Sequence, residues 1–597
     1  MKKLTLLFIL FSGFLAAQQG NLPLNDQWMT ESEAQMVKSR GFLLPVSLLS
    51  YDQDSLLRVF AATSYTDSLH SVLIDNPATV AWPMQTSLRP LIEQGHPLRH
   101  SYNVHNNHGT RLPAQPHLGK DPGRHGPGWI RRRKFQHGIK KYHFQNSLLQ
   151  VEQPAKGDVP LFRLYIDPML NLQYSKLMND TSTEMLYVNS RGVTARGDIG
   201  TKVSFETSFM ENQTFLPAYQ DSFALDYKVI PGMGRWKKFK TTGYDYAMAS
   251  GMISWSMCRY FNIQVGHGKH FVGDGIRSLL LSDNSFNYPY ARFTGWIGAN
   301  KNIQYSVIYA SLMNLNYSAI SPPAGTEALL KKKSAVFHHV SWKFLRTFEV
   351  SLFQGAIYAP VNDSNRQQLD FWYFNPVIGA SAIANGLNNP NNYLLGATFR
   401  ADLFRTLSVY GQFMLDEMKT KIVSGPGNNK NGYQLGIRYF DAFTVKHLHL
   451  RVEYNAVNAF SYSANSGDNS WSHYNQALAH PLGAGFKEIN ATLYYKVSDF
   501  FISGNVFLAK ANLDNDTANY GQNIFNSDIP RYPGTGEPAT LTSGDVHIGW
   551  MISYASNLNV AAGYRFRNLD VNGNQNSTSF VYVALRTSLT NANFDLF

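Results

Sequence analysis

The chain has 597 residues, of which 16% are charged and 14% are aromatic, and its mean hydropathy is −0.26. The charged fraction is well below the roughly 25% of ordinary soluble proteins, and the negative mean hydropathy excludes a helical membrane protein. Few charges, many aromatic residues and modest hydropathy favour a β-barrel with lipid outside, a polar lumen inside and aromatic girdles at both interfaces. The net charge of +12 raises nucleic acid as a partner, but the export signal described next argues against it.

The N-terminus carries the pattern of an export signal. Lys2 and Lys3 form a positive n-region, residues 4–15 form an apolar h-region, and Ala16 with Ala17 offers a small-residue cleavage site. We therefore expect residues 1–17 to be a cleaved signal peptide. The h-region is too short for a membrane-spanning helix, which needs about 20 apolar residues, and no other apolar run approaches that length. Any crossing of the membrane is therefore expected to be by strands.

Residues 18–145 differ in composition from the rest and are expected to form a partly helical, partly irregular extension. Apolar residues recur at helix-compatible spacing in Glu31–Arg40 and Asp52–Ile74. Residues 77–127 are rich in Pro, Gly, His and Asn, which is typical of loops. Many cations gather between Arg111 and Lys141. That stretch is either a solvated basic linker or a patch facing anionic lipopolysaccharide or an acidic partner protein.

From residue 146 to residue 597 the apolar pattern changes to a period of two. Tyr433, Leu435 and Ile437 alternate with Gln434, Gly436 and Arg438, and similar alternation recurs at residues 303–307, 406–413, 448–455 and 558–565. Segments of about 10–12 residues exceed the usual soluble strand of about 5–6 and match a tilted strand crossing the hydrocarbon core. The predicted fold class is all-β, a transmembrane antiparallel β-barrel of about 18 strands, closed so that no edge is exposed.

The links between these segments alternate in length. Residues 441–446 and 498–500 are short links, whereas residues 215–244, 361–392, 455–486 and 511–543 are long ones. Short turns on one rim and long loops on the other are expected of an outer-membrane barrel. The chain ends in Phe597, and a terminal aromatic residue is common in such barrels. The single cysteine, Cys258, lies in the apolar run 252–260 and is expected to act as a small apolar residue.

Three polar and aromatic clusters lie at strand ends or in loops. The first, residues 266–284, contains His267, Lys269, Asp274, Arg277 and Asp283. Its glycines suggest a phosphate-cradling loop, but the Walker spacing and the strand-to-helix context are absent. His267 and His270 could bind a metal, but no third or fourth ligand is predictable. The competing interpretation is a tight turn that re-enters the barrel or folds into its lumen.

The second cluster, residues 370–376, contains Trp372 and Asn375, and the third, residues 471–483, contains Trp471, Tyr474, Asn475 and His480. Aromatic faces beside amides and carboxylates suit sugars, because C–H groups stack on the rings while hydroxyls pair with the polar groups. The competing interpretation is an interfacial aromatic belt with loop packing.

Carboxylates and cofactor ligands give no comparable signal. Glu206, Asp416, Glu417 and Glu453 could be posed as an acid–base pair, but nothing in the sequence fixes their separation. We therefore expect no catalytic residue, no bound metal and no cofactor. The candidate ligand-binding residues are His267, Lys269, Asp274, Arg277, Asp283, Trp372, Asn375, Trp471, Tyr474, Asn475 and His480.

Short segments spread over residues 146–510 also carry a family resemblance. They are His267–Phe271, Arg277–Asn284, Tyr373–Pro376, Tyr410–Phe413, Leu415–Glu417, Val452–Asn455, His473–Gln476 and His480–Gly483. In order and wording they resemble an outer-membrane family of Bacteroidetes that is similar to the capsule assembly protein Wzi and includes the gliding-motility protein RemB. The resemblance implies a large barrel of about 18 strands with a small helical element. It further implies a surface lectin for capsular polysaccharide, or a cell-surface component of gliding. The resemblance does not assign a sugar-binding role to any individual residue of this chain.

The leading expectation is a non-enzymatic outer-membrane protein that binds or organises surface polysaccharide, coupled to adhesion or gliding motility and surrounded by membrane lipid and lipopolysaccharide. A channel is the first alternative, with a lumen lined by Arg438, Arg451, Glu453 and Arg565. A structural partner of a secretion or gliding machine, contacted through the basic stretch Arg131–Lys141, is the second. An outer-membrane hydrolase is the last.

Overall fold

The computed structural model describes residues 130–131, 149–153, 162–178, 186–199, 203–258, 260–298, 303–317, 330–345, 348–358, 375, 377–378, 380, 391–403, 406–417, 429–497, 499–515, 518–526, 536–553 and 558–587. The predicted signal peptide, both predicted N-terminal helices, Trp372 and Phe597 lie outside these residues. The predicted basic stretch also lies outside them, except for Arg131.

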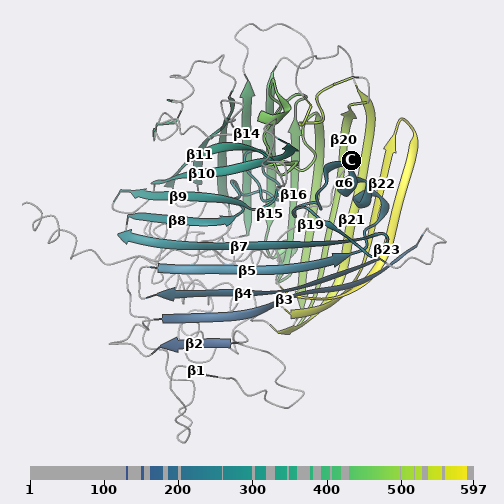
Figure 1. Ribbon diagram of the computed structural model, residues 1–597, viewed down its shortest axis with the longest axis horizontal. Helices are drawn as coiled ribbons and strands as arrows, with labels where there is room; N and C mark the ends of the chain where they lie inside the picture. Colours follow the sequence, from purple (N-terminus) through teal and green to yellow (C-terminus); the bar gives the residue numbers. More distant parts are fainter. Residues whose placement is uncertain are drawn as a thin grey trace, which may run out of the picture.

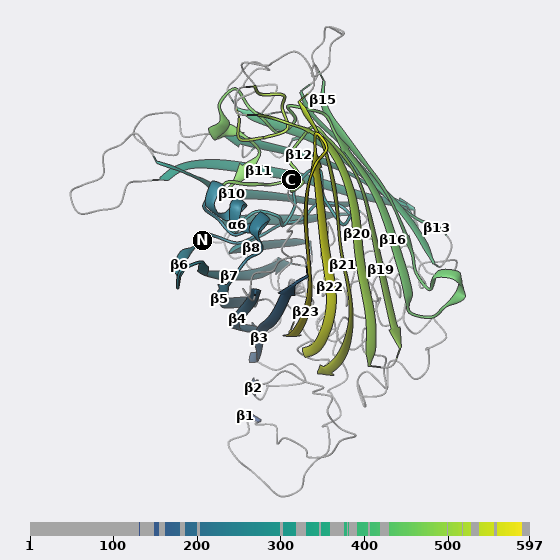
Figure 2. The same cartoon turned by 90° about the vertical axis from the view of Figure 1, so that its right-hand side faces the viewer.

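Within this part of the chain, eighteen strands close into an antiparallel β-barrel (Figures 1 and 2). Neighbouring strands of the ring follow one another along the chain, and β23 pairs with β3 to close it. The predicted fold class is therefore confirmed. The strands of the ring are β3 (Phe162–Leu177), β4 (Leu186–Ile199), β5 (Val203–Thr214), β7 (Gly243–Cys258), β8 (Phe261–Gly268), β9 (Tyr288–Ile297), β10 (Ile303–Tyr317), β11 (Leu330–Leu345), β12 (Phe348–Tyr358), β13 (Asn392–Leu403), β14 (Leu407–Glu417), β15 (Lys430–Tyr439), β16 (Leu448–Val457), β19 (Phe486–Val497), β20 (Phe500–Leu513), β21 (Glu537–Ser553), β22 (Leu558–Val571) and β23 (Asn574–Arg586).

Three short strands join the sheet without belonging to the ring: β1 (Ile130–Arg131), β2 (Leu149–Gln153) and β6 (Lys237–Phe239). β2 pairs with residues 162–166 of β3, whereas β23 pairs with residues 171–177 of the same strand. β2 therefore extends the sheet along the part of β3 that β23 does not reach. Figure 1 shows β2 beside β3.

The barrel wall is inverted relative to a soluble protein. On β15 the side chains of Tyr433, Leu435 and Ile437 are exposed, whereas Gln434 and Arg438 are buried. On the neighbouring β16, Val452 is exposed and Glu453 is fully buried. An apolar outer face and a polar inner face are what lipid outside the wall requires, so these strands cross a membrane. The predicted lumen positions of Arg438 and Glu453 are confirmed.

The two rims of the barrel differ as predicted. Short turns join strands on one rim, for example at residues 259–260 and 498–499. Long connections lie on the other rim, where the structure describes residues 215–242, 269–287 and 458–485 in full. We call the rim with the long connections the loop side.

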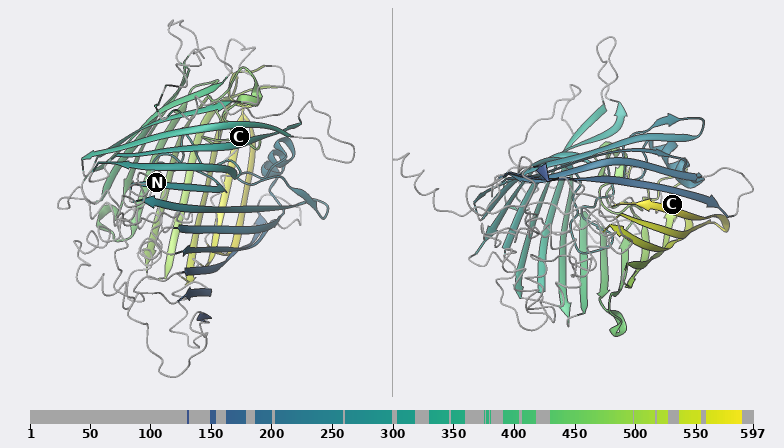
Figure 3. Two further views of the ribbon diagram at one scale, coloured as in Figure 1. Left: turned by 60° about the vertical axis from the view of Figure 1, so that its left-hand side comes forward. Right: turned by 90° about the horizontal axis from the view of Figure 1, so that it is seen from below.

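Two of the long connections fold into the barrel. Leu279 and Leu280 of residues 269–287 and Trp471 and Leu478 of residues 458–485 are fully buried and belong to one core cluster. We call these two segments together the lumenal plug. The first cluster therefore follows the competing interpretation, a segment that folds into the lumen. Figure 3 shows the ring around this interior from two further directions.

The helix α6 (Ala218–Tyr227) lies in the connection between β5 and β7. Apolar spacing does not predict it, although the family resemblance implies a small helical element. Ala224 is buried, and the indole of Trp236 donates a 2.9 Å hydrogen bond to its carbonyl oxygen, so tertiary contacts hold this helix. Among the helices of the described residues, none combines the length and apolarity needed to cross a membrane.

Several strands are longer than the predicted 10–12 residues, and β21 has 17. The neighbouring hairpin of β22 and β23 shows why. Its tip at residues 574–577 reads Asn-Gln-Asn-Ser and is exposed on both faces. Strand ends that stand in water need no apolar face, so the alternation that reveals the lipid-facing part does not extend to them.

A candidate ligand-binding site at the loop side

The first and third predicted clusters meet inside the barrel as the two parts of the lumenal plug. The indole of Trp471 donates to the carbonyl oxygen of Leu280 at 2.9 Å, and the hydroxyl of Tyr462 donates to that of Leu279 at 2.8 Å. The backbone N–H of Ser282 donates to the carbonyl oxygen of Leu478 at 2.7 Å. Almost 200 residues apart in sequence, the two segments thus satisfy each other's buried backbone groups.

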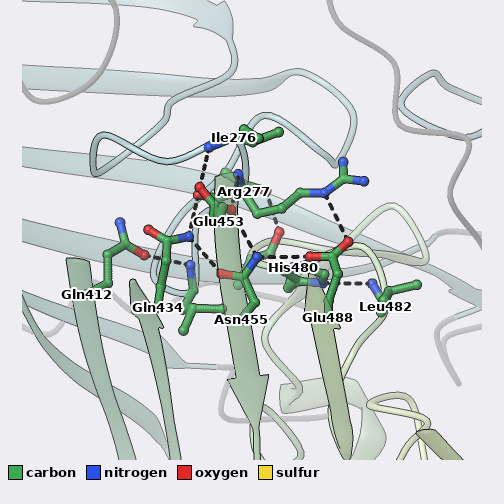
Figure 4. A network of polar contacts seen from close by, with 12 residues as sticks. Ile276, Arg277, Gln412, Gln434, Glu453, Asn455, His480, Leu482 and Glu488 are labelled. Carbon is green, nitrogen blue, oxygen red and sulfur yellow. Dashed lines mark hydrogen bonds and ion pairs between the residues drawn. The ribbon is translucent and has the colours of Figure 1, made fainter. Parts of the chain in front are cut away.

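The plug is tied to the barrel wall by inward-facing polar side chains (Figure 4). One carboxylate, that of Glu453, accepts the backbone N–H groups of Ile276 at 2.6 Å and Arg277 at 3.1 Å. It also accepts the hydroxyl of Tyr410 at 2.8 Å and the amide of Asn455 at 2.9 Å. Such a carboxylate is an acceptor whose lone pairs are filled, which makes it a structural anchor.

Two wall glutamines repeat this arrangement. Gln412 accepts the N–H of Leu279 at 2.8 Å and donates to the carbonyl oxygen of Val272 at 2.9 Å. Gln434 donates to the carbonyl oxygen of Arg277 at 2.9 Å. On strands β14 to β16, the inward polar side chains that could line a channel therefore hold the plug instead.

Three of the candidate residues are members of buried charge contacts. The guanidinium of Arg277 lies 3.7 Å from Glu488, and the imidazole of His480 contacts the same carboxylate at 2.8 Å. Asp274 lies 3.4 Å from Arg400 of β13. All these side chains are less than 9% exposed. They join the plug to the wall and are not available to a ligand from solvent in this conformation.

Lys269 and Asp283 lie at the edge of the plug. The ammonium group of Lys269 donates to the carbonyl oxygen of Gly232 at 2.6 Å. Burial lowers the pKa of Lys269 to about 8, and the nearby charge of Asp283 opposes that shift. Lys269 therefore places a partly buried ammonium group beside the β5–β7 connection.

His267 is partly exposed and contacts the carbonyl oxygen of Ala249 through Nδ1 at 3.1 Å. His270 is buried, and its Nδ1 lies 3.1 Å from the hydroxyl of Tyr288. Among the described residues, no group of three or more His, Cys, Asp or Glu side chains lies close enough together to hold a metal ion.

The third cluster ends in an unusual turn. β17 (Ser472–His473) and β18 (Gln476–Ala477) form a hairpin whose two turn residues, Tyr474 and Asn475, have φ angles of 55° and 54°. A two-residue turn of this kind normally carries Asn and Gly, and a left-handed conformation costs a residue with a side chain roughly 1–2 kcal/mol.

Three hydrogen bonds hold that turn. The N–H of Tyr474 donates to Met313 at 2.8 Å, and Asn475 accepts the N–H of Leu315 at 3.2 Å. The amide of Asn475 donates to the carbonyl oxygen of Tyr227, at the end of α6, at 3.2 Å. Tyr474 and Asn475 nevertheless stay partly exposed. The ring of Tyr474 lies 4.8 Å, between centroids, from that of Phe286. We call Tyr474, Asn475 and Phe286 the aromatic turn.

Of the second cluster, residues 370–376, the structure describes only Asn375. Trp372 lies outside the described residues. Asn375 uses its side-chain oxygen to accept the N–H of Val377 at 3.0 Å, a local turn contact.

Sequence reasoning missed most of the residues that hold the site. Glu488, Gln412, Gln434 and Gln476 are all buried, and none was a candidate. For Gln412, Gln434 and Glu488 the signal is a polar side chain at an inward position of an alternating strand, whereas Gln476 lies within the third cluster itself. Glu453 and Asp416, posed above as hydrolase carboxylates, instead accept backbone N–H groups of the plug.

No family model matches the sequence, and no curated protein matches it. Among solved structures, the chain is similar to Wzi of Escherichia coli, described as a carbohydrate-binding β-barrel involved in group 1 capsule assembly. That alignment has a TM-score of 0.44 and 13% identity and covers 71% of this chain and 85% of Wzi. OprD of Pseudomonas aeruginosa aligns with a TM-score of 0.37 and 12% identity, over 71% and 94% of the two chains. OccAB2 of Acinetobacter baumannii aligns with a TM-score of 0.38 and 10% identity, over 71% and 97%. None of these similarities carries functional information for this chain.

Proposed function

We propose that this chain is a non-enzymatic outer-membrane barrel that binds surface polysaccharide at its loop side. The observation that carries the proposal is the aromatic turn. Tyr474 is a partly exposed aromatic residue held in a left-handed backbone conformation beside a second ring and an amide. Strain of this kind persists only where surrounding contacts enforce it, and such positions gather at binding sites.

The chemistry of the aromatic turn suits a sugar. A ring face accepts the C–H groups of a pyranose, and the adjacent amide can exchange hydrogen bonds with hydroxyls. The plug beneath the turn is packed and hydrogen-bonded, so the ring is preorganised and loses little conformational freedom on binding. In keeping with the family resemblance, we extend the proposal to a role in capsule organisation, adhesion or gliding motility.

Replacing Tyr474 should weaken polysaccharide binding without unfolding the barrel. We expect Tyr474→Ala to reduce affinity at least about tenfold, because truncating a central aromatic contact typically costs about 2 kcal/mol. The measurement is binding of purified full-length barrel to an array of bacterial surface glycans, followed by titration with the best ligand.

Phe443→Ala is the matched control for that variant. Phe443 is also an aromatic residue with a left-handed backbone, at φ 55°, but it is 69% exposed in a turn of the opposite rim. It should leave affinity unchanged. Equal effects of the two substitutions, or no binding of the wild-type barrel to any surface glycan, would refute the proposal.

A channel is the second candidate, favoured by charged inward positions on the wall such as Asp545 and Arg565, which lie 3.2 Å apart on β21 and β22. The two candidates predict opposite conductance. Under our proposal the wild-type barrel shows no steady conductance in a planar bilayer, because the lumenal plug is fixed by buried hydrogen bonds. Steady ion currents from single wild-type barrels would favour the channel.

A further inference from the structure

The connection between β5 and β7 carries a concentration of positive charge at the loop side. Residues 226–240 hold one carboxylate, Asp226, against five exposed cations: Lys228, Arg235, Lys237, Lys238 and Lys240. Within the part of the chain that the structure describes, these five cations form no ion pair. We call this segment the basic loop. Asp245 lies opposite Lys237 across the β6–β7 pairing, which leaves the loop with a net excess of positive charge that attracts anionic ligands.

The backbone of the basic loop is fixed. Gln476 accepts the N–H of Gly232 at 2.6 Å and donates to the carbonyl oxygen of Met233 at 2.8 Å. Val229 pairs with Arg235 across the loop as a β-bridge. The ring of Trp236 packs edge-on against Tyr244, with centroids 4.7 Å apart. The loop therefore presents its cations from a rigid base.

The basic loop is continuous with the aromatic turn. Gln476, which holds the loop, directly follows Asn475 in the chain. The ring of Phe286 lies against Gly234, where an added Cβ would come within 3.0 Å of it. Burial raises the pKa of the Tyr474 phenol, and the charge of Arg235 acts in the opposite direction, so that guanidinium lies within electrostatic reach of the ring. Through Gly232, Met233, Gly234 and Arg235, the basic loop thus adjoins the aromatic turn.

We infer that the polysaccharide bound at this surface is acidic, with its carboxylate groups held by the basic loop while a sugar face stacks on Tyr474. This inference rests on the proposed function and names its ligand class. Carboxylates on successive sugars would meet cations spread along the loop, and ammonium and guanidinium groups donate strong hydrogen bonds to them. Single exposed contacts of this kind are weak and are screened by salt. Several along one polymer act together, so binding should be firm at low salt and fall as salt is raised.

The test compares acidic and neutral polymers on the full-length barrel in detergent. Polygalacturonate is the acidic probe, and the same polymer with its carboxylates reduced to alcohols is the neutral probe. The variant is Lys238→Glu, and the matched control is Lys446→Glu, which reverses one exposed lysine in the turn between β15 and β16 on the opposite rim. We expect the wild type to prefer the acidic polymer at least tenfold. Lys238→Glu should weaken that binding about tenfold at low salt, and Lys446→Glu should leave it unchanged.

The outcomes separate this inference from the proposed function. Equal binding of the acidic and reduced polymers, or equal effects of the two lysine variants, overturns the acidic ligand but leaves polysaccharide binding standing. Absence of binding to any glycan overturns both. Binding confined to lipopolysaccharide, and lost when its phosphates are removed, assigns the basic loop to lipid phosphate and also overturns the inference. The unfolding midpoint of each variant is measured alongside, since these exposed side chains should leave it within about a degree of wild type.

Discussion

Replacing Glu453 by alanine should release the first segment of the lumenal plug from the barrel wall. Its carboxylate is fully buried and accepts four hydrogen bonds, two of them from the backbone of Ile276 and Arg277. Removing it leaves buried donors without an acceptor, and hydrogen bonds to charged groups contribute about 1.5–3 kcal/mol each. We expect the free energy of unfolding to fall by about 3–5 kcal/mol, because each buried donor left without an acceptor costs about 1–3 kcal/mol.

The release should also make residues 269–287 accessible to a protease and open the lumen to ions. Arg277 and Lys269 are trypsin sites that the fold buries or holds against the backbone. Trypsin added to the folded Glu453→Ala barrel should therefore cut the segment 269–287 faster than in the wild type, and ion conductance in a planar bilayer should rise. Glu417→Gln is the control, because Glu417 lies at the outward loop-side end of β14. If trypsin sensitivity, conductance and stability of Glu453→Ala all match those of Glu417→Gln, the plug is not held as described.

The wall of this barrel could be predicted from sequence because lipid imposes a local rule. Tyr433, Leu435 and Ile437 must face hydrocarbon and their neighbours must not. Apolar and polar residues therefore alternate along the ten residues of the strand. The helix α6 and the tip of the β22–β23 hairpin escaped prediction for the opposite reason. Neither contacts lipid along its length, and what holds α6, such as the indole of Trp236, comes from elsewhere in the chain.

The interior could not be predicted because its partners are distant. Glu453 and Arg277 are 176 residues apart in sequence, and the residues next to each of them do not predict the contact. Composition alone is also ambiguous. Aromatic residues, amides and histidines suit a sugar platform, but they equally suit a packed plug inside a polar wall. Trp471 and His480 prove to be fully buried, whereas Tyr474, three residues from Trp471, stays partly exposed. Only burial separates the two roles.

That separation leads to a prediction about Trp471. Its ring is fully buried, lies edge-on to Phe337 with centroids 5.6 Å apart, and donates to Leu280. It also fills the space above Gly355 of β12, where an added Cβ would come within 2.1 Å of the ring. Trp471→Ala should therefore lower the free energy of unfolding by about 3–5 kcal/mol, the cost of a large buried cavity. Trp471→Phe keeps most of the packing and loses the hydrogen bond, which contributes about 0.5–1.5 kcal/mol, so its loss should be clearly smaller.

The decisive comparison is between stability and ligand affinity across the two aromatic residues. Chemical denaturation should show that Trp471→Phe is less stable than wild type, while titration of the folded barrel shows polysaccharide affinity within about twofold, because Trp471 does not reach the surface. Tyr474→Ala should show the reverse, with weakened binding and a stability loss of only about 1 kcal/mol, the contribution of its contact with Phe286. Loss of binding in Trp471→Phe at wild-type stability would mean that the indole reaches the ligand directly. The plug would then have to open during binding, and the hydrogen bonds that join it to Glu453, Gln412 and Gln434 would be the contacts that break.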